Sequence, residues 1–75
     1  MRFNVEYTDT FCGEANYSWV KRAEIELPDD AKDREIMRKA KATVGLTGVR
    51  GVTDFCSDTI RFRPFRRNTV MFITW

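Results

Sequence analysis

Only one segment of this chain has the periodicity of a helix, and alternating, strand-type segments lie on both sides of it. From Asp30 to about Val44, apolar side chains recur every three or four residues, which places them on one helix face. Gly45 can adopt positive φ and is a natural residue to end that helix. A chain of 75 residues has room for one core. The order predicts a single α+β domain over residues 1–75, ββαβββ, with one helix packed on a largely antiparallel sheet.

Five strands are expected around the helix, over residues 2–8, 17–27, 49–56, 59–65 and 69–75. Residues 9–16 have no sustained period and many turn formers, which predicts a hairpin loop longer than the tightest kind. The last strand is apolar almost throughout, so we expect it at the centre of the sheet and buried on both faces. Pro64 cannot donate a ladder hydrogen bond and belongs at an edge or a strand end.

The first turn and the outer face of the helix can also be predicted. Asp30, followed three residues later by Asp33, resembles a capping box and is expected to open the helix. Beside the apolar stripe runs a basic row that is expected to face away from the sheet, formed by Arg34, Arg38 and Lys41.

Two aromatic residues near the start of the second expected strand have two interpretations. Alternation places Tyr17 and Trp19 in the inner row, and burial against the helix is the favoured interpretation. The alternative is that they form, with Tyr7 and Phe11, an exposed aromatic surface for a protein partner. The alternation fails at residues 20–21, which predicts a bulge or a sheet edge there.

The composition is that of a folded cytoplasmic domain. Hydrophobic residues make up 43% of the chain, which is too many for intrinsic disorder. No apolar stretch approaches the roughly 20 residues of a membrane span, and residues 1–4 begin no signal-peptide pattern. A secreted domain of this size usually carries a denser disulfide framework, so Cys12 and Cys56 are expected to be free thiols in a reducing cytosol.

The residue types argue against an enzyme. The chain has no histidine, which excludes the Cys/His and Ser/His nucleophile pairs. Two separated cysteines are too few for a structural zinc site, and the four glycines form no phosphate-binding motif. We therefore expect no catalytic site, no metal and no cofactor, and infer that the protein works by binding.

Charge is divided unevenly along the chain. Residues 1–37 carry nine acidic and five basic side chains, whereas residues 38–75 carry two acidic and eight basic ones. Such asymmetry favours an electropositive face for an acidic partner, or head-to-tail self-association. A homodimer is among the expected partners.

The densest basic segment is residues 61–67, and it is the first candidate binding site. Guanidinium groups bind phosphates and carboxylates in a bidentate manner, and a neighbouring aromatic ring can add a stacking platform. Strand alternation is expected to turn its first two arginines toward solvent. The candidate residues are Arg61, Arg63, Phe65, Arg66 and Arg67. The alternative is that these arginines only solubilise an edge strand.

Two segments, residues 7–20 (YTDTFCGEANYSWV) and 45–51 (GLTGVRG), together with the ending at 69–75, resemble those of small uncharacterised proteins encoded by bacteriophages and prophages. The resemblance carries over no catalytic or binding residues. It implies a context in which small proteins bind and block a host protein, and some inhibit CRISPR defence systems.

Two functions follow as hypotheses. The first is a phage-type inhibitor of a host protein or ribonucleoprotein complex, such as a CRISPR effector. Its acidic residues could imitate phosphates in a cationic groove, and they are Asp9, Glu14, Glu24, Glu26, Asp29 and Asp30. The alternative is a small nucleic-acid-binding module that uses Arg50 with the arginines of residues 61–67 on phosphates.

Overall fold

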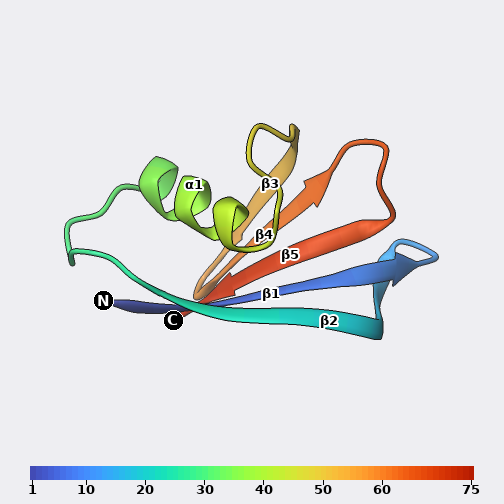
Figure 1. Ribbon diagram of the computed structural model, residues 1–75, viewed down its shortest axis with the longest axis horizontal. Helices are drawn as coiled ribbons and strands as arrows, with labels where there is room; N and C mark the ends of the chain where they lie inside the picture. Colours follow the sequence, from blue (N-terminus) through green and yellow to red (C-terminus); the bar gives the residue numbers. More distant parts are fainter.

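The computed structural model describes all 75 residues and has the predicted order of elements (Figure 1). The elements are β1 (Arg2–Phe11), β2 (Glu14–Glu26), α1 (Asp33–Thr43), β3 (Gly51–Cys56), β4 (Thr59–Pro64) and β5 (Thr69–Thr74). The strands form one antiparallel sheet in the order β2-β1-β5-β4-β3. The predicted α+β class is therefore confirmed, as are the central position of β5 and the place of Pro64 at a strand end.

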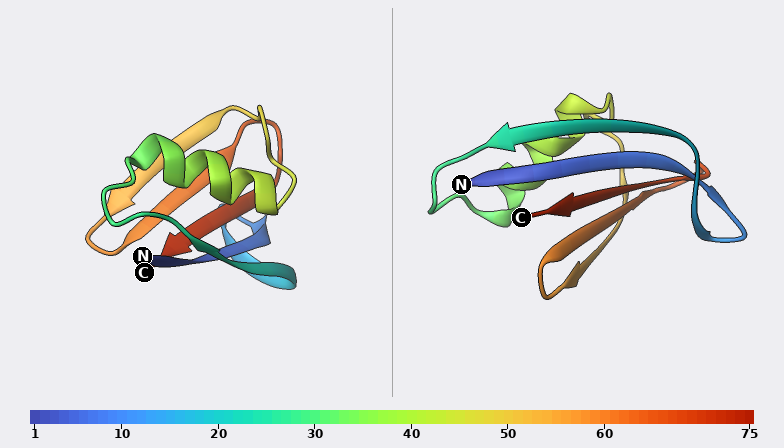
Figure 2. Two further views of the ribbon diagram at one scale, coloured as in Figure 1. Left: turned by 60° about the vertical axis from the view of Figure 1, so that its left-hand side comes forward. Right: turned by 90° about the horizontal axis from the view of Figure 1, so that it is seen from below.

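The molecule has two layers, because α1 crosses one face of the sheet and no helix or strand covers the other, which we call the uncovered face (Figures 1 and 2). Alternate residues of the strands point toward the helix and form the core with it. This core consists of Phe3, Val5, Tyr7, Ile25, Ile36, Ala40, Val44, Leu46, Ile60, Phe62, Met71 and Ile73. On the uncovered face of β5, Val70 is buried but Phe72 is only half-buried, so β5 is buried on both faces over part of its length, not throughout as expected.

The helix begins at Asp33, three residues later than predicted. The expected capping box is absent, because the Pro28 carbonyl accepts the Ala31 N–H at 3.0 Å and closes a separate turn. Lys32 is then extended and precedes the helix without a side-chain cap. At the other end the prediction is confirmed, since Gly45 has a φ of +79°.

The basic row of the helix is shorter than predicted, because Lys41 does not face solvent freely. Its Nζ atom lies 4.2 Å from the centroid of the Phe62 ring and donates to the Val49 carbonyl at 2.9 Å. These contacts combine a cation–π interaction with a hydrogen bond. Arg34 and Arg38 are exposed, as expected.

The hairpin between β1 and β2 is tight, and the long loop expected over residues 9–16 is wrong. Only Cys12 and Gly13 separate the strands, with φ values of +54° and +82°. Positive φ at both central residues is typical of a two-residue hairpin turn whose twist matches the strands. The polar residues before it belong to β1, because Asp9 pairs with Thr69 of β5.

Candidate functional site

Two turns meet at one end of the sheet, and together they form the candidate site (right-hand side of Figure 1). The first is the β1–β2 turn and the second is the β4–β5 turn at residues 65–68. The Thr10 N–H donates to the Asn68 carbonyl at 2.8 Å, which holds the turns side by side. The sequence predicted the second turn but gave no sign that the first lies next to it.

A groove of about 460 Å³ lies between these turns and collects most of the predicted basic residues. Its lining consists of Thr10, Gly13, Val52, Arg63, Pro64, Phe65, Arg66, Arg67 and Thr69. Arg50 lies beside it, because its carbonyl accepts the Phe65 N–H at 2.9 Å. Arg50, Arg66 and Arg67 are exposed and form no ion pair. Their charges are therefore available to an anionic partner.

Arg61 lies apart from this groove and is engaged within the protein. Its Nη2 atom donates to Asp54 Oδ2 at 2.9 Å, and Arg63 lies 3.7 Å from the same oxygen. Both arginines point out of the uncovered face, as alternation predicted, but Arg61 is only half-exposed. Asp54 stands on the neighbouring strand directly opposite Arg61, a pairing that the spacing in sequence does not reveal.

A wide bulge in β2 shapes the neighbouring surface. Thr8 pairs with Val20 and Thr10 with Ala15, so residues 16–19 of β2 stand opposite Asp9 alone. The bulge therefore lies just before residues 20–21, and β2 is an edge strand, as the alternative expectation of a sheet edge stated. Tyr17 has a φ of +57° within it, which breaks the alternation that the prediction used.

The side chains of Thr8 and Asp9 fill the bulge. Thr8 Oγ1 accepts the Tyr17 N–H at 3.1 Å and donates to the Trp19 carbonyl at 2.8 Å. Asp9 accepts hydrogen bonds from the N–H and hydroxyl of Ser18 and from the amide of Asn16. Backbone groups that lose their partners in the strand ladder are thus satisfied by two side chains of the adjacent strand.

The bulge leaves Tyr17 and Trp19 exposed, which corrects the expectation that they are buried against the helix. Tyr17 is 48% exposed and donates to Glu6 Oε1 at 2.6 Å, on the uncovered face. Trp19 is 41% exposed, and its ring meets Tyr7, on the helix side, edge-on at 5.3 Å. Phe11, at the end of β1, is 70% exposed. The alternative interpretation is right that Tyr17, Trp19 and Phe11 are exposed. However, Tyr7 is buried in the core and Tyr17 lies on the opposite face from Trp19, so the four rings do not form one surface.

The hydrogen bonds in the bulge change the acidity of Asp9. Donation from the Ser18 hydroxyl, and then from Asn16, lowers the Asp9 pKa from 3.8 to about 2. A carboxyl whose pKa is depressed on folding stabilises the protein above its unfolded pKa and loses that contribution as the pH falls through the folded value.

We predict that Asp9→Asn destabilises the protein near neutral pH and that this difference shrinks as the pH falls from about 4 to about 2. Urea unfolding of both proteins across that range measures it. The control is Asp58→Asn, a change in the β3–β4 turn that leaves the bulge intact. A difference between wild type and Asp9→Asn that is independent of pH would contradict the prediction.

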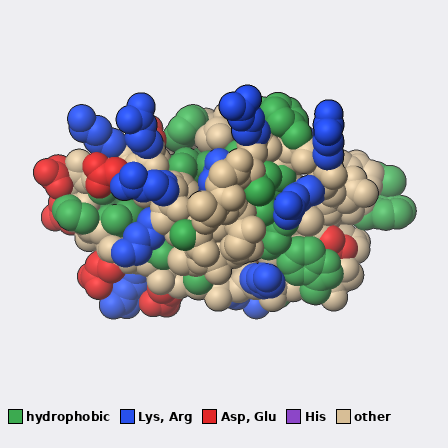
Figure 3. Space-filling view, turned by 45° about the horizontal axis from the view of Figure 1, so that its top comes forward, with side chains coloured by type: hydrophobic (Ala, Val, Ile, Leu, Met, Phe, Trp, Pro, Cys, Tyr) green, Lys and Arg blue, Asp and Glu red, His purple; other side chains and the backbone are tan.

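The predicted acidic residues do not form one surface. Asp9 and Glu14 belong to the hairpin end of β1 and β2. Four others lie at or near the opposite end of the sheet, namely Glu24 and Glu26 at the end of β2 and Asp29 and Asp30 in the connection to α1. There Asp29 pairs with the Met1 ammonium at 3.1 Å, and Glu24 lies 3.8 Å from Arg2. Figure 3 shows the acidic side chains mainly at one end, with Lys and Arg spread along the molecule.

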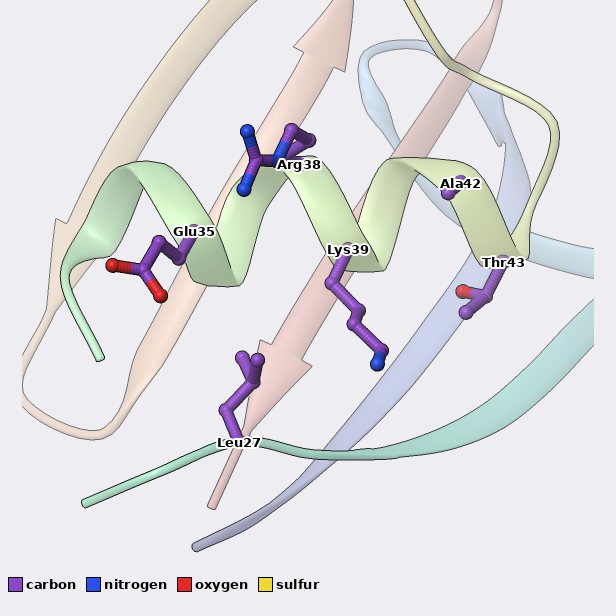
Figure 4. A pocket seen from close by; sticks show the side chains of 6 residues that line it. All are labelled: Leu27, Glu35, Arg38, Lys39, Ala42 and Thr43. Carbon is purple, nitrogen blue, oxygen red and sulfur yellow. The ribbon is translucent and has the colours of Figure 1, made fainter. Parts of the chain in front are cut away.

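A second cavity, of about 390 Å³, lies between α1 and the segment that follows β2 (Figure 4). Leu27 forms one side, and the helix contributes Glu35, Arg38, Lys39, Ala42 and Thr43. None of the predicted binding residues lines it. Its polar side chains are surface groups of α1, so it lacks the converging buried polar groups of a specific ligand site.

No three carboxylate or cysteine groups gather as a metal site would require, and no helix has the length and apolar character to span a bilayer. Cys12 and Cys56 are exposed thiols, one at the hairpin turn and one at the end of β3. The chain matches no family model, and no curated protein or solved structure shows significant similarity to it.

Proposed function

We propose that this is a non-enzymatic binding protein that contacts its partner through the tip surface, which we define as Phe11, Trp19, Phe65, Arg66 and Arg67. The observation that carries the proposal is that exposed Phe65 and the unpaired Arg66 and Arg67 adjoin the turn that follows exposed Phe11. Exposed Trp19 lies in the β2 bulge that leads away from this turn. Phe11 and Phe65 are 70% and 56% exposed. Exposure of these large apolar rings to water is unfavourable, and burying them against a partner lowers the free energy of the complex.

The partner that this surface fits best is a protein with an acidic patch. Trp and Arg are among the residues that most often dominate binding energy at protein interfaces, particularly where the aromatic rings are well packed in the complex. The resemblance to phage proteins suggests that the partner is a host protein or ribonucleoprotein complex, such as a CRISPR effector, which the protein inhibits by occupying a working surface.

The second candidate is binding to single-stranded nucleic acid, and the position of Phe65 favours it. Phe65 lines the groove together with Arg63, Arg66 and Arg67. A stacking ring among cations that contact the backbone is the usual arrangement for unpaired bases. Against this candidate stands the formal net charge of only +2.

The first test is affinity capture from a bacterial lysate, followed by binding measurements with the captured partner. We predict that the triple variant Phe65→Ala, Arg66→Glu, Arg67→Glu weakens binding about 30-fold or more, because it removes a hot-spot ring and reverses two charges. The matched control, Arg34→Glu with Arg38→Glu on α1, makes the same charge change away from the tip surface. Unchanged affinity of a folded triple variant would exclude this surface.

A salt titration separates the two candidates. Binding of a labelled single-stranded oligonucleotide that falls steeply and log-linearly with salt concentration would support the nucleic-acid function. A protein complex held by aromatic burial should weaken only modestly over the same range. No oligonucleotide binding at low salt would exclude the second candidate.

A further inference from the structure

The face of the sheet opposite α1 is uncovered, and its charges have an unusual order. Seen from below, the five strands lie open to the viewer with the helix behind them (Figure 2, right). One residue from each strand meets its neighbours directly across this face, because the strand registers align them in a single row. In sheet order from β2 to β3, this central row is Arg22, Glu6, Phe72, Arg61 and Asp54.

The row reads positive, negative, apolar, positive, negative. Its charged side chains are accessible, with 67% of Arg22, 30% of Glu6, and 40% each of Arg61 and Asp54 exposed. Phe72 lies half-buried at the centre. Reversing the order of the row converts every charge into its opposite and leaves Phe72 in place.

We propose that this face binds a second copy of the same chain, in a face-to-face dimer whose two-fold axis runs along β5. Rotation by 180° about that axis exchanges the two sides of the row. Phe72 then meets the partner's Phe72, Glu6 meets the partner's Arg61, and Arg22 meets the partner's Asp54. Each charge lies opposite its complement, and the aromatic rings meet on the axis, as an isologous interface requires.

The same row rejects the alternative two-fold arrangement. A two-fold axis perpendicular to the strands would place each strand over the same strand of the partner. Glu6 would then meet the partner's Glu6, and Arg61 the partner's Arg61. Like charges in direct opposition are unfavourable. The charge order thus selects one orientation of the two sheets, in which their strands run nearly aligned, as in stacked antiparallel sheets.

A second pair of residues fits the same rotation. Val20 and Val52 lie two residues from Arg22 and Asp54, each toward the end of the sheet that carries the β1–β2 and β4–β5 turns. The axis along β5 therefore brings Val20 opposite the partner's Val52. Val52 is 48% exposed, and apolar burial would supply the attraction that surface ion pairs alone provide weakly.

The size of the face limits the strength of this dimer. Five strands about 4.8 Å apart, with about six residues of 3.3 Å each, present roughly 24 Å by 20 Å. Two such faces bury roughly 1,000 Å² in total, which is below the size of a stable specific interface and typical of a weak, transient one. Because the axis runs along the strands, both tip surfaces would lie at the same end of the dimer. The dimer does not depend on the proposed function, since the central row and the tip surface share no residue.

Sedimentation over a concentration series, with charge-swapped variants, tests the dimer. Glu6→Arg and Arg61→Glu should each weaken self-association about tenfold or more, because each places like charges opposite one another. An equimolar mixture of the two variants should form heterodimers, since Arg at position 6 meets Glu at position 61 in one contact and the native Glu6 meets the native Arg61 in the other. The double variant should regain self-association. Arg38→Glu on α1 is the control and should behave as wild type.

Thermal unfolding first establishes that each variant is folded. If Glu6→Arg does not fold, Phe72→Glu replaces it, because this change puts two like charges together on the axis and should abolish the dimer. A wild-type protein that remains monomeric at the highest concentrations would overturn the proposal. It would also be overturned by dimers that persist in folded Arg61→Glu, or by a mixture of folded single variants that stays monomeric.

Discussion

Replacing Gly51 with alanine is expected to destabilise the domain by about 3 kcal/mol, because β3 and β4 leave no space for a side chain there. A Cβ atom at this position would overlap the carbonyl oxygen of Arg63 and lie 2.8 Å from Pro64 Cα. These neighbours are backbone atoms of the paired strand, so they cannot move aside without opening the ladder. Gly51 is also next to Arg50, whose carbonyl accepts the Phe65 N–H near the groove.

Urea unfolding followed by circular dichroism would measure the effect of Gly51→Ala. Val52→Ala, one residue along the same strand, is the matched control, because Val52 is 48% exposed and meets no such obstruction. We expect the control to change the free energy of unfolding by about 1 kcal/mol or less. Similar stabilities for the two variants would show that the strands can separate easily at Gly51.

Replacing Phe62 with alanine should destabilise the protein by about 3–5 kcal/mol. Phe62 is 2% exposed and belongs to the core between the sheet and α1. Its removal leaves a cavity and also removes the ring over which Lys41 Nζ lies. Domains of this size have only a few kcal/mol of stability to lose, so a large fraction of the variant should be unfolded at room temperature.

The matched control for Phe62→Ala is Phe55→Ala, since it removes the same side chain from the adjacent strand. Phe55 is 58% exposed, so little apolar contact is lost there. Thermal melts should show a large decrease in the melting temperature for Phe62→Ala and a small one for Phe55→Ala. Comparable decreases would mean that Phe55, which pairs with the core residue Ile60 on the helix side of the sheet, is packed in solution.

The sequence predicts the fold class of this protein well because hydrophobic periodicity is a local signal. The apolar stripe of α1 and the Gly45 stop can be read within a few residues. The helix start is harder, because Asp30 has the right side chain for a cap but lies in a turn closed by the Pro28 carbonyl. Side-chain type alone does not decide between a cap and a turn.

The candidate site is less predictable because it depends on contacts between distant segments. The arginines of residues 61–67 are visible in the sequence, but the ion pairs with Asp54 depend on strand register. Tyr17 and Trp19 alternate regularly in the sequence, but the structure places three additional residues of β2 opposite Asp9, which breaks the alternation. The available signal was the Thr8-Asp9 pair, since short polar side chains of this kind often bind free backbone groups.

The central position of β5 has a consequence for how the chain folds. The β1–β2 and β3–β4 hairpins each pair locally, but they share no ladder and are joined only through β5. The five-stranded sheet therefore cannot form until β5 has been synthesised and inserted between β1 of the first hairpin and β4 of the second. Pairing β1 with β5 closes a loop of nearly the whole chain, which raises the contact order and slows folding. A nascent chain on the ribosome would expose the edges of both hairpins until that final strand emerges.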